Sequence, residues 1–316
     1  MNSSYSKRVG NGRSWLCLAA VLVGFVFVLG SATPSHAQAL GWEGETGILV
    51  TPLAYTASSE TEKLHPVVAY HFLDLGPVIG DFHEASFELG IGKRIEVGYT
   101  HEFHAFGNDM VASGGGPGLS VLWQNGFDIF NGKYNLIAEN AFKTKWVPAI
   151  STGFIARTGV RNVGDFQNSP GATGHTNGDL YVVASKVIPV KPVPVLLSAG
   201  VRGTDAELWG IGGSAPNWQA RAFGSVAFIF KMPGKSTLIL ASEAEQQPHH
   251  PYGFDGVAGP VLNIPTTFTY AARFVPTSKY KLNFDLGIAQ IAGNVNSALP
   301  SLQARHQVGM QVSYGF

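Results

Sequence analysis

The chain has 316 residues, of which 13% are charged and 45% are hydrophobic, and its formal net charge is zero. Ordinary soluble proteins carry about 25% charged residues, so this chain is poor in charge for a protein whose whole surface meets water. A zero net charge offers no basic surface to nucleic acid, and we expect no nucleic-acid partner.

The first 37 residues have the three parts of a secretory signal peptide. Three basic residues make a positive start, residues 16–29 are apolar, and the tripeptide Ser35-His36-Ala37 is a small-residue cleavage site. The apolar part is shorter than the ~20 residues that a membrane-spanning helix needs, which argues against a retained anchor. We therefore expect residues 1–37 to be a signal peptide and residues 38–316 to form a single domain.

Removal of the signal peptide changes the charge and the redox chemistry of the protein. It holds three of the 21 basic residues and none of the 21 acidic ones, so 18 Lys and Arg remain against 21 Asp and Glu, a net charge of −3. The single cysteine, Cys17, is removed as well. The mature protein then has neither a disulfide framework nor a thiolate metal site.

Beyond residue 37, apolar and polar residues alternate at period two, which is typical of strands with two different faces. No stretch reaches the ~18 apolar residues of a transmembrane helix. In chain order the expected strands are Thr46–Pro52, Pro66–Phe72, Phe82–Ile91, Arg94–Phe103, Lys133–Ile137, Val147–Thr158, Leu180–Ile188, Val193–Gly203, Trp218–Lys231, Ser236–Glu243, Thr266–Phe274, Lys279–Gln290 and Gln303–Phe316, with Leu119–Phe130 as a possible fourteenth. Residues 113–118, 162–178 and 246–259 have the composition of long loops.

The last expected strand carries an additional pattern. Val308, Met310 and Val312 share one face with Tyr314 and the final residue, Phe316. Such a strand, with an aromatic residue two positions before a terminal phenylalanine, resembles the assembly signal of bacterial outer-membrane β-barrel proteins. The resemblance implies export and insertion into the outer membrane, with outer-membrane lipid and the barrel-assembly machinery as partners. It assigns the signal itself to Tyr314 and Phe316.

These observations predict an all-β fold: a transmembrane, antiparallel, up-and-down β-barrel with about 12–14 strands, located in the cell outer membrane. Closure is required because hydrocarbon cannot satisfy an open sheet edge, and bacterial barrels usually have an even number of strands. A soluble periplasmic β-sandwich would alternate in the same way. It would explain neither the pattern of the last strand nor the placement of glycine and charge on the face opposite the apolar one.

The alternation also predicts which charged side chains point into the lumen. The basic set is Arg94, Lys133, Arg157, Lys186, Arg202, Arg221, Arg273, Lys281 and Arg305, and the acidic set is Glu96, Glu102, Glu243 and Asp285. We read this lumen as basic and hence attractive to anions. The alternative is that these residues form ion pairs that fill a narrow lumen.

Catalytic and metal-binding patterns are weak. His101 and His104 would point to opposite faces of a strand, and His249 and His250 belong to an expected loop, so we expect no metal site. No Gly-x-Ser-x-Gly elbow and no phosphate-binding loop is present. We expect no catalytic residue, no cofactor and no enzymatic activity.

The leading functional hypothesis is therefore a porin-like channel or transport protein for small solutes, with anions favoured by the lumen charge. Two alternatives remain open. One is a plugged structural or assembly barrel that serves the export of envelope polymers. The other is an outer-membrane lipid hydrolase.

Overall fold

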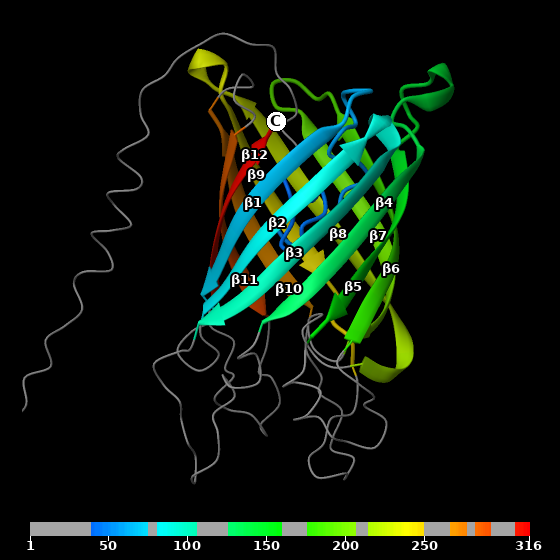
Figure 1. The fold of residues 1–316 in the computed structure, drawn as a ribbon. Coiled ribbons are helices and arrows are strands. Elements are labelled where there is room, and N and C mark those ends of the chain that lie inside the picture. Colours follow the sequence, from blue (N-terminus) through cyan, green and yellow to red (C-terminus); the bar gives the residue numbers. More distant parts are fainter. Residues whose placement is uncertain are drawn as a thin grey trace, which may run out of the picture.

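A computed structural model describes residues 39–74, 81–105, 126–159, 176–206, 214–249, 266–276, 282–291 and 307–316. They form a closed barrel of twelve antiparallel strands, which confirms the expected fold (Figure 1). Within these ranges no helix is long and apolar enough to cross a membrane. The expected signal peptide lies outside the described residues and stays a prediction.

Each strand pairs with its neighbours in the chain, and β1 pairs with β12 to close the barrel. The strands are β1 (His65–Asp74), β2 (Asp81–Ile91), β3 (Ile95–Ala105), β4 (Phe127–Ile137), β5 (Ala149–Thr158), β6 (Thr176–Ile188), β7 (Val195–Ala206), β8 (Ser214–Lys231), β9 (Thr237–Glu245), β10 (Thr267–Val275), β11 (Leu282–Ile291) and β12 (Gln307–Gly315).

Twelve of the thirteen expected strands correspond to strands of the barrel. The possible fourteenth, Leu119–Phe130, reaches only the beginning of β4, and its residues 119–125 lie outside the described residues. The expectation for Thr46–Pro52 is wrong. These residues belong to the interior of the barrel and form only isolated bridges, Leu40 with Thr46 and Gly47 with Pro52.

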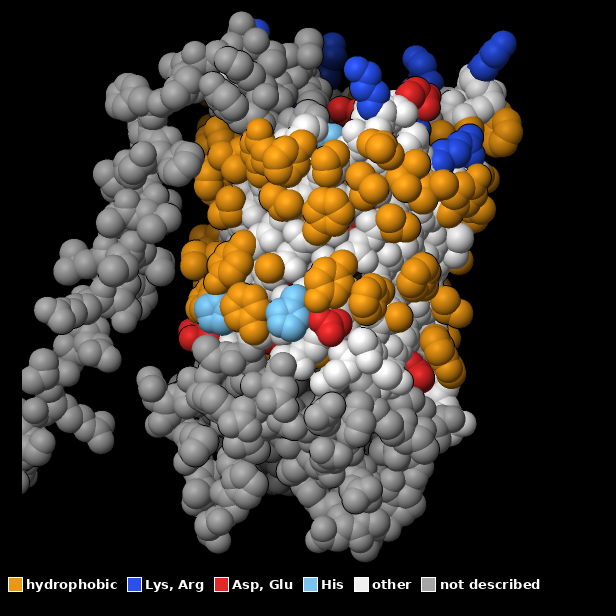
Figure 2. Space-filling model, viewed as in Figure 1, with side chains coloured by type: hydrophobic (Ala, Val, Ile, Leu, Met, Phe, Trp, Pro, Cys, Tyr) orange, Lys and Arg blue, Asp and Glu red, His pale blue; other side chains and the backbone are white. Residues whose placement is uncertain are grey.

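The outward face of the strands is apolar. On β2, Phe87 is 47% exposed while Ser86 and Glu88 beside it are buried, and the same alternation runs around the barrel. Hydrophobic side chains form a band around the visible face, with Lys and Arg gathered above it (Figure 2). An apolar outer face over a polar inner face is the arrangement of a barrel in lipid. The protein is accordingly an outer-membrane β-barrel.

The two ends of the barrel differ in the length of their connections. At one end, which we call the turn end, short connections join β2 to β3, β6 to β7 and β8 to β9, and β12 ends here with the C-terminus (Figure 1). At the other end, the loop end, longer connections join β3 to β4, β5 to β6 and β11 to β12. In bacterial barrels the short turns face the periplasm and the long loops face outward.

Candidate functional site

The lumen contains a segment of the same chain, residues 39–59, which we call the lumen segment. Sixteen of its 21 residues are buried inside the barrel, and the other five are half-buried. It turns back on itself: the amide of Trp42 donates to the carbonyl of Leu49 at 2.6 Å, and the amide of Leu53 donates to that of Thr46 at 3.0 Å. Gly44 has a φ of +92°, and a Cβ there would overlap the Thr100 hydroxyl of the barrel wall. Glycine is therefore required at this turn.

One carboxylate of the wall holds the central turn of the lumen segment. Oε1 of Glu243, on β9, accepts hydrogen bonds from the amides of Leu49, Val50 and Thr51 at 3.2, 3.1 and 2.8 Å, and from the Thr51 hydroxyl at 2.7 Å. Successive amides that converge on one anion form a concave anion-binding nest. In this protein the nest belongs to the segment and the anion to the wall, so Glu243 anchors the segment.

A buried ion pair anchors the same segment from the opposite wall. Lys133 on β4 lies 2.6 Å from Glu96 on β3, and both side chains are fully buried. Glu96 also accepts from the Thr46 amide at 3.0 Å and the Ala57 amide at 2.8 Å. Lys133 donates to the carbonyls of Thr46 and Tyr55 at 2.8 and 3.2 Å. The remaining hydrogen-bonding capacity of the pair is thus used by the lumen segment.

Arginines and acids form a second network nearer the loop end. Arg157 on β5 is buried and lies 2.7 Å from Asp179 on β6, and it also contacts Glu43 of the lumen segment. Arg202 on β7 lies 3.4 Å from Asp179 and pairs with Glu245 on β9. These arginines therefore have carboxylate partners and are not free cations in an open lumen.

Arg273 and Asp285 form a third anchor. Their side chains, on β10 and β11, make a bidentate pair with N–O distances of 2.9 and 3.0 Å. The same guanidinium donates to the carbonyl of Ile48 at 2.6 Å. Beside it, a Cβ at Gly287 would overlap the Leu49 side chain, so the wall is shaped to receive the segment.

The expectation of a basic lumen is wrong for the described residues. Nine acidic side chains are buried, against four basic ones: Lys133, Arg157, Arg202 and Arg273. The acids missed by the sequence reading include Glu84 and Glu88 on β2, Asp179 on β6 and Glu245 on β9. The sequence nevertheless indicates their inward orientation, because each lies an even number of positions from a residue that points inward, such as Ser86 or Glu243.

Among the other expected lumen residues, Arg94 is misplaced and Arg221 is on the inner face, opposite Arg202 in the pairing of β7 with β8. Arg94 does not begin a strand; it lies in the turn η1 (Gly92–Arg94), is exposed, and donates to the carbonyls of Asn135 and Leu136 at 3.4 and 3.2 Å. The turn forms because the chain must reverse between β2 and β3. Arg221 on β8 is half-buried and donates to the carbonyl of Gln247 at 2.7 Å. Lys281 and Arg305 lie outside the described residues.

The C-terminal aromatic residues meet on the outer surface at the turn end. The rings of Tyr314 and Phe316 are 5.0 Å apart and nearly perpendicular. The Phe316 amide donates to the Pro66 carbonyl at 3.0 Å, beside the pairing of β1 with β12. Their role as an assembly signal stays a prediction.

Histidines lie on the outer face near the loop end (Figure 2). His101 points outward, 2.8 Å from Asp128, whereas the side chain of His104 and all of His250 lie outside the described residues. Among the residues with described positions, no group of three or more His, Asp or Glu is placed to hold a metal ion.

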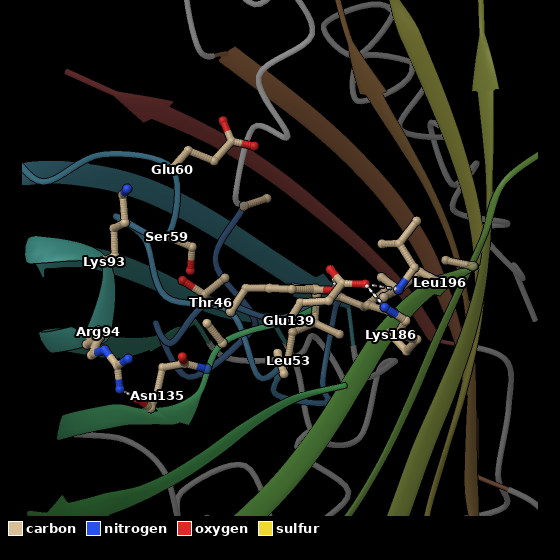
Figure 3. Close-up of a pocket in the computed structure, with 18 of the residues that line it drawn as sticks. Thr46, Leu53, Ser59, Glu60, Lys93, Arg94, Asn135, Glu139, Lys186 and Leu196 are labelled. Atoms are coloured by element: carbon tan, nitrogen blue, oxygen red, sulfur yellow. Dashed lines mark hydrogen bonds and ion pairs between the residues drawn. The ribbon is translucent and has the colours of Figure 1, made fainter. Parts of the chain in front are cut away.

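A cavity of about 1190 Å³ lies between the lumen segment and the wall at the turn end. Leu53 and Leu196 line it, and at its mouth Glu139 and Lys186 point toward one another with an N–O distance of 3.0 Å (Figure 3). Glu139 also accepts a hydrogen bond from the Tyr55 hydroxyl of the lumen segment at 2.9 Å. The lumen is thus filled near its centre and hollow at the turn end.

Comparison with known proteins gives one family match and several similar solved structures. The model of the family described as "Protein of unknown function (DUF3034)" matches residues 39–251. No curated protein sequence matches the chain. Among solved structures, the COG4313 outer membrane channel from Pseudomonas putida F1 is similar at 11% identity, with 90% of this chain and 100% of that chain covered and a TM-score of 0.43.

Two further structures are similar over 80% of this chain. The NanC porin has 8% identity, 99% of its own chain covered and a TM-score of 0.41. The translocator domain of the autotransporter NalP from Neisseria meningitidis has 11% identity, 88% of its own chain covered and a TM-score of 0.37. With these scores below 0.5, what the protein does must be inferred from its own geometry.

Proposed function

Because the family match spans more than half of its length, the chain belongs to the DUF3034 family, and we propose that it is an outer-membrane channel for small solutes that its own lumen segment keeps closed at rest. The observation that carries the proposal is the way residues 39–59 are held. Their anchors are charged side chains that hydrogen-bond to backbone groups, as Glu243 does to Leu49, Val50 and Thr51. The match begins at residue 39, so it includes the whole segment.

The polar character of these anchors supports a closure that can be reversed. A hydrogen bond to a charged group contributes only about 1.5–3 kcal/mol net, and a released segment would exchange its wall contacts for hydrogen bonds to water. The cavity at the turn end gives solutes or water a place from which to enter. Since short turns face the periplasm, we assign that cavity to the periplasmic side.

The excess of buried acids determines the ions that we expect an opened lumen to prefer. Nine acidic side chains are buried against four basic ones. When the lumen opens and water reaches these carboxyl groups, they ionise and favour cations, because rings of carboxylates attract cations. Anion preference, which the lumen arginines suggested from sequence, would require them to be unpaired. Arg157, Arg202 and Arg273 are each paired with a carboxylate.

Planar-bilayer recordings test the proposal. The wild type should be mostly silent with rare discrete openings, and the double variant Glu96→Gln with Glu243→Gln, which weakens two anchors, should open far more often. The control is Ser242→Ala, whose side chain points away from the lumen. Reversal potentials under a KCl gradient should indicate potassium over chloride. A double variant that folds, loses the docking of the segment and still shows no openings would instead favour the plugged structural barrel.

The lipid-hydrolase alternative has one candidate pair among the described residues, Ser86 Oγ and His71 Nε2 at 3.4 Å. Both side chains are buried in the lumen, and Nδ1 of His71 has no acid to orient it, so the pair does not support lipid hydrolysis. Release of fatty acid from phospholipid vesicles by the purified protein would support the lipid-hydrolase hypothesis instead.

A further inference from the structure

The connection between β4 and β5 is unusual in what it exposes. Phe142 and Trp146 are 80% and 89% exposed, the two highest values among the large apolar side chains of the described residues. Lys143 and Lys145 alternate with them and are exposed as well. Burial of such aromatic surface is favourable, so an exposed pair beside two lysines indicates a contact surface.

The backbone of this connection is held in a costly conformation. Asn140, Phe142 and Lys143 have φ values of 61°, 58° and 58°, in the left-handed region that bulky residues rarely adopt. The amide of Asn140 donates to the carbonyl of Val147 at 3.0 Å, which closes the turn. Such strain persists where the surrounding structure fixes it, and it marks sites of function more often than chance.

The base of the turn supplies that rigidity. Lys186 on β6 donates to the Asn140 side chain at 2.6 Å and lies 3.0 Å from Glu139. Glu139 also accepts from the amide of Val187 at 2.9 Å. The turn is therefore held rigid, and it projects beyond the ends of the strands (Figure 1).

The occupant of this surface follows from its position and charge. The lipid-facing side of β4 leads directly into it, through Tyr134 and Leu136, which are 44% and 47% exposed. Neither Lys143 nor Lys145 has a carboxylate partner among the described residues. Aromatic side chains favour the interface between hydrocarbon and head groups, and lysines there are attracted to anionic lipid.

We propose that the β4–β5 turn is a binding site for anionic phospholipid in the leaflet at the turn end, with Phe142 and Trp146 in the interface and Lys143 and Lys145 at the head-group phosphates. The site stands on the exterior of the barrel and does not depend on whether the lumen conducts. It predicts a preference for phosphatidylglycerol over phosphatidylcholine that comes from this turn alone.

Fluorescence quenching by brominated lipids tests the site in reconstituted vesicles. The Trp146 contribution is the difference between the wild type and Trp146→Phe, measured with brominated phosphatidylglycerol or brominated phosphatidylcholine at the same mole fraction. We expect at least fivefold stronger association of Trp146 with phosphatidylglycerol. Lys143→Gln with Lys145→Gln should abolish this preference, because it removes both charges and leaves the aromatic residues.

The matched control lies in another turn at the same end. Lys231→Gln with Lys235→Gln, beside the turn η4 (Pro233–Lys235), removes the same charge and should leave the preference of Trp146 unchanged. Equal quenching by the two lipids would overturn the proposal. Absence of quenching by either lipid would also overturn it, because the turn would then face the periplasm and fit a protein partner.

Discussion

Loss of the Glu243 carboxylate should release the lumen segment, and the size of the effect can be worked out from its contacts. Four donors converge on Oε1 at 2.7–3.2 Å. One oxygen has two lone pairs, so we count two full hydrogen bonds to a charged group, at about 1.5–3 kcal/mol each. Water that enters the space left by Glu243→Ala can accept some of these hydrogen bonds. We therefore expect the free energy of docking of the lumen segment to fall by about 3 kcal/mol, which lowers the docking equilibrium constant roughly 150-fold.

Cysteine labelling measures this equilibrium directly. The only natural cysteine is Cys17, in the expected signal peptide, so Val50→Cys gives a single reporter on the half-buried turn. Its reaction with a water-soluble maleimide should be about 100-fold faster in Glu243→Ala and less accelerated in Glu243→Gln, whose amide oxygen can replace Oε1. Ser242→Ala should have no effect. Equal labelling rates in Glu243→Ala and the wild type, with the barrel still folded by heat-modifiable gel migration, would refute the anchoring role.

Three further predictions concern the interior and the closing strand. Lys133→Met should destabilise the barrel by about 3–5 kcal/mol in urea unfolding because it leaves Glu96 buried without its cation, and the double variant with Glu96→Gln should lose less; additive losses would contradict the pairing. Burial, with a contribution from Glu43, raises the pKa of Glu45 from 4.5 to about 8. Docking of the segment should therefore be strongest below about pH 4.5 and weaken as the pH rises to about 8. The ratio of Val50→Cys labelling between the wild type and a Glu45→Gln background should rise over this range, and a flat ratio would contradict it. Tyr314→Ala with Phe316→Ala should reduce the amount of heat-modifiable protein in the outer membrane, whereas normal amounts would show that the terminal pattern is coincidental.

The wall of the barrel was predictable from sequence because each strand meets two different environments. Lipid on one side and lumen on the other impose a period of two that local sequence records, as in Leu286 outside and Asp285 inside β11. The error at Thr46–Pro52 has a different origin. This segment is a short run of β-branched and apolar residues, and such a composition cannot distinguish a strand of the wall from a segment that the wall encloses.

The candidate site was less predictable because its contacts depend on distant register. Arg273 meets Asp285 only because β10 and β11 place them opposite one another, and Arg157 meets Asp179 one strand away with an offset. The alternation of side chains along each strand shows that such residues share the lumen. It cannot show that they pair with one another and with backbone groups of the lumen segment, so the sequence predicts a basic channel where the structure has ion pairs and a docked segment.

The position of the lumen segment in the chain also constrains the order of folding. Arg273 bonds to Ile48 across 225 residues, and Glu243 bonds to Leu49 across 194. The segment leaves the export machinery early. The wall residues that bind it, Glu243 and Arg273, are in place only after β9 and β10 have joined the sheet. Contacts of such separation form slowly, because a long loop must close before they contribute. Docking of residues 39–59 should therefore be a late step of biogenesis, completed around the time that β1 meets β12. The nascent protein would spend its assembly with an unfilled, hydrated interior.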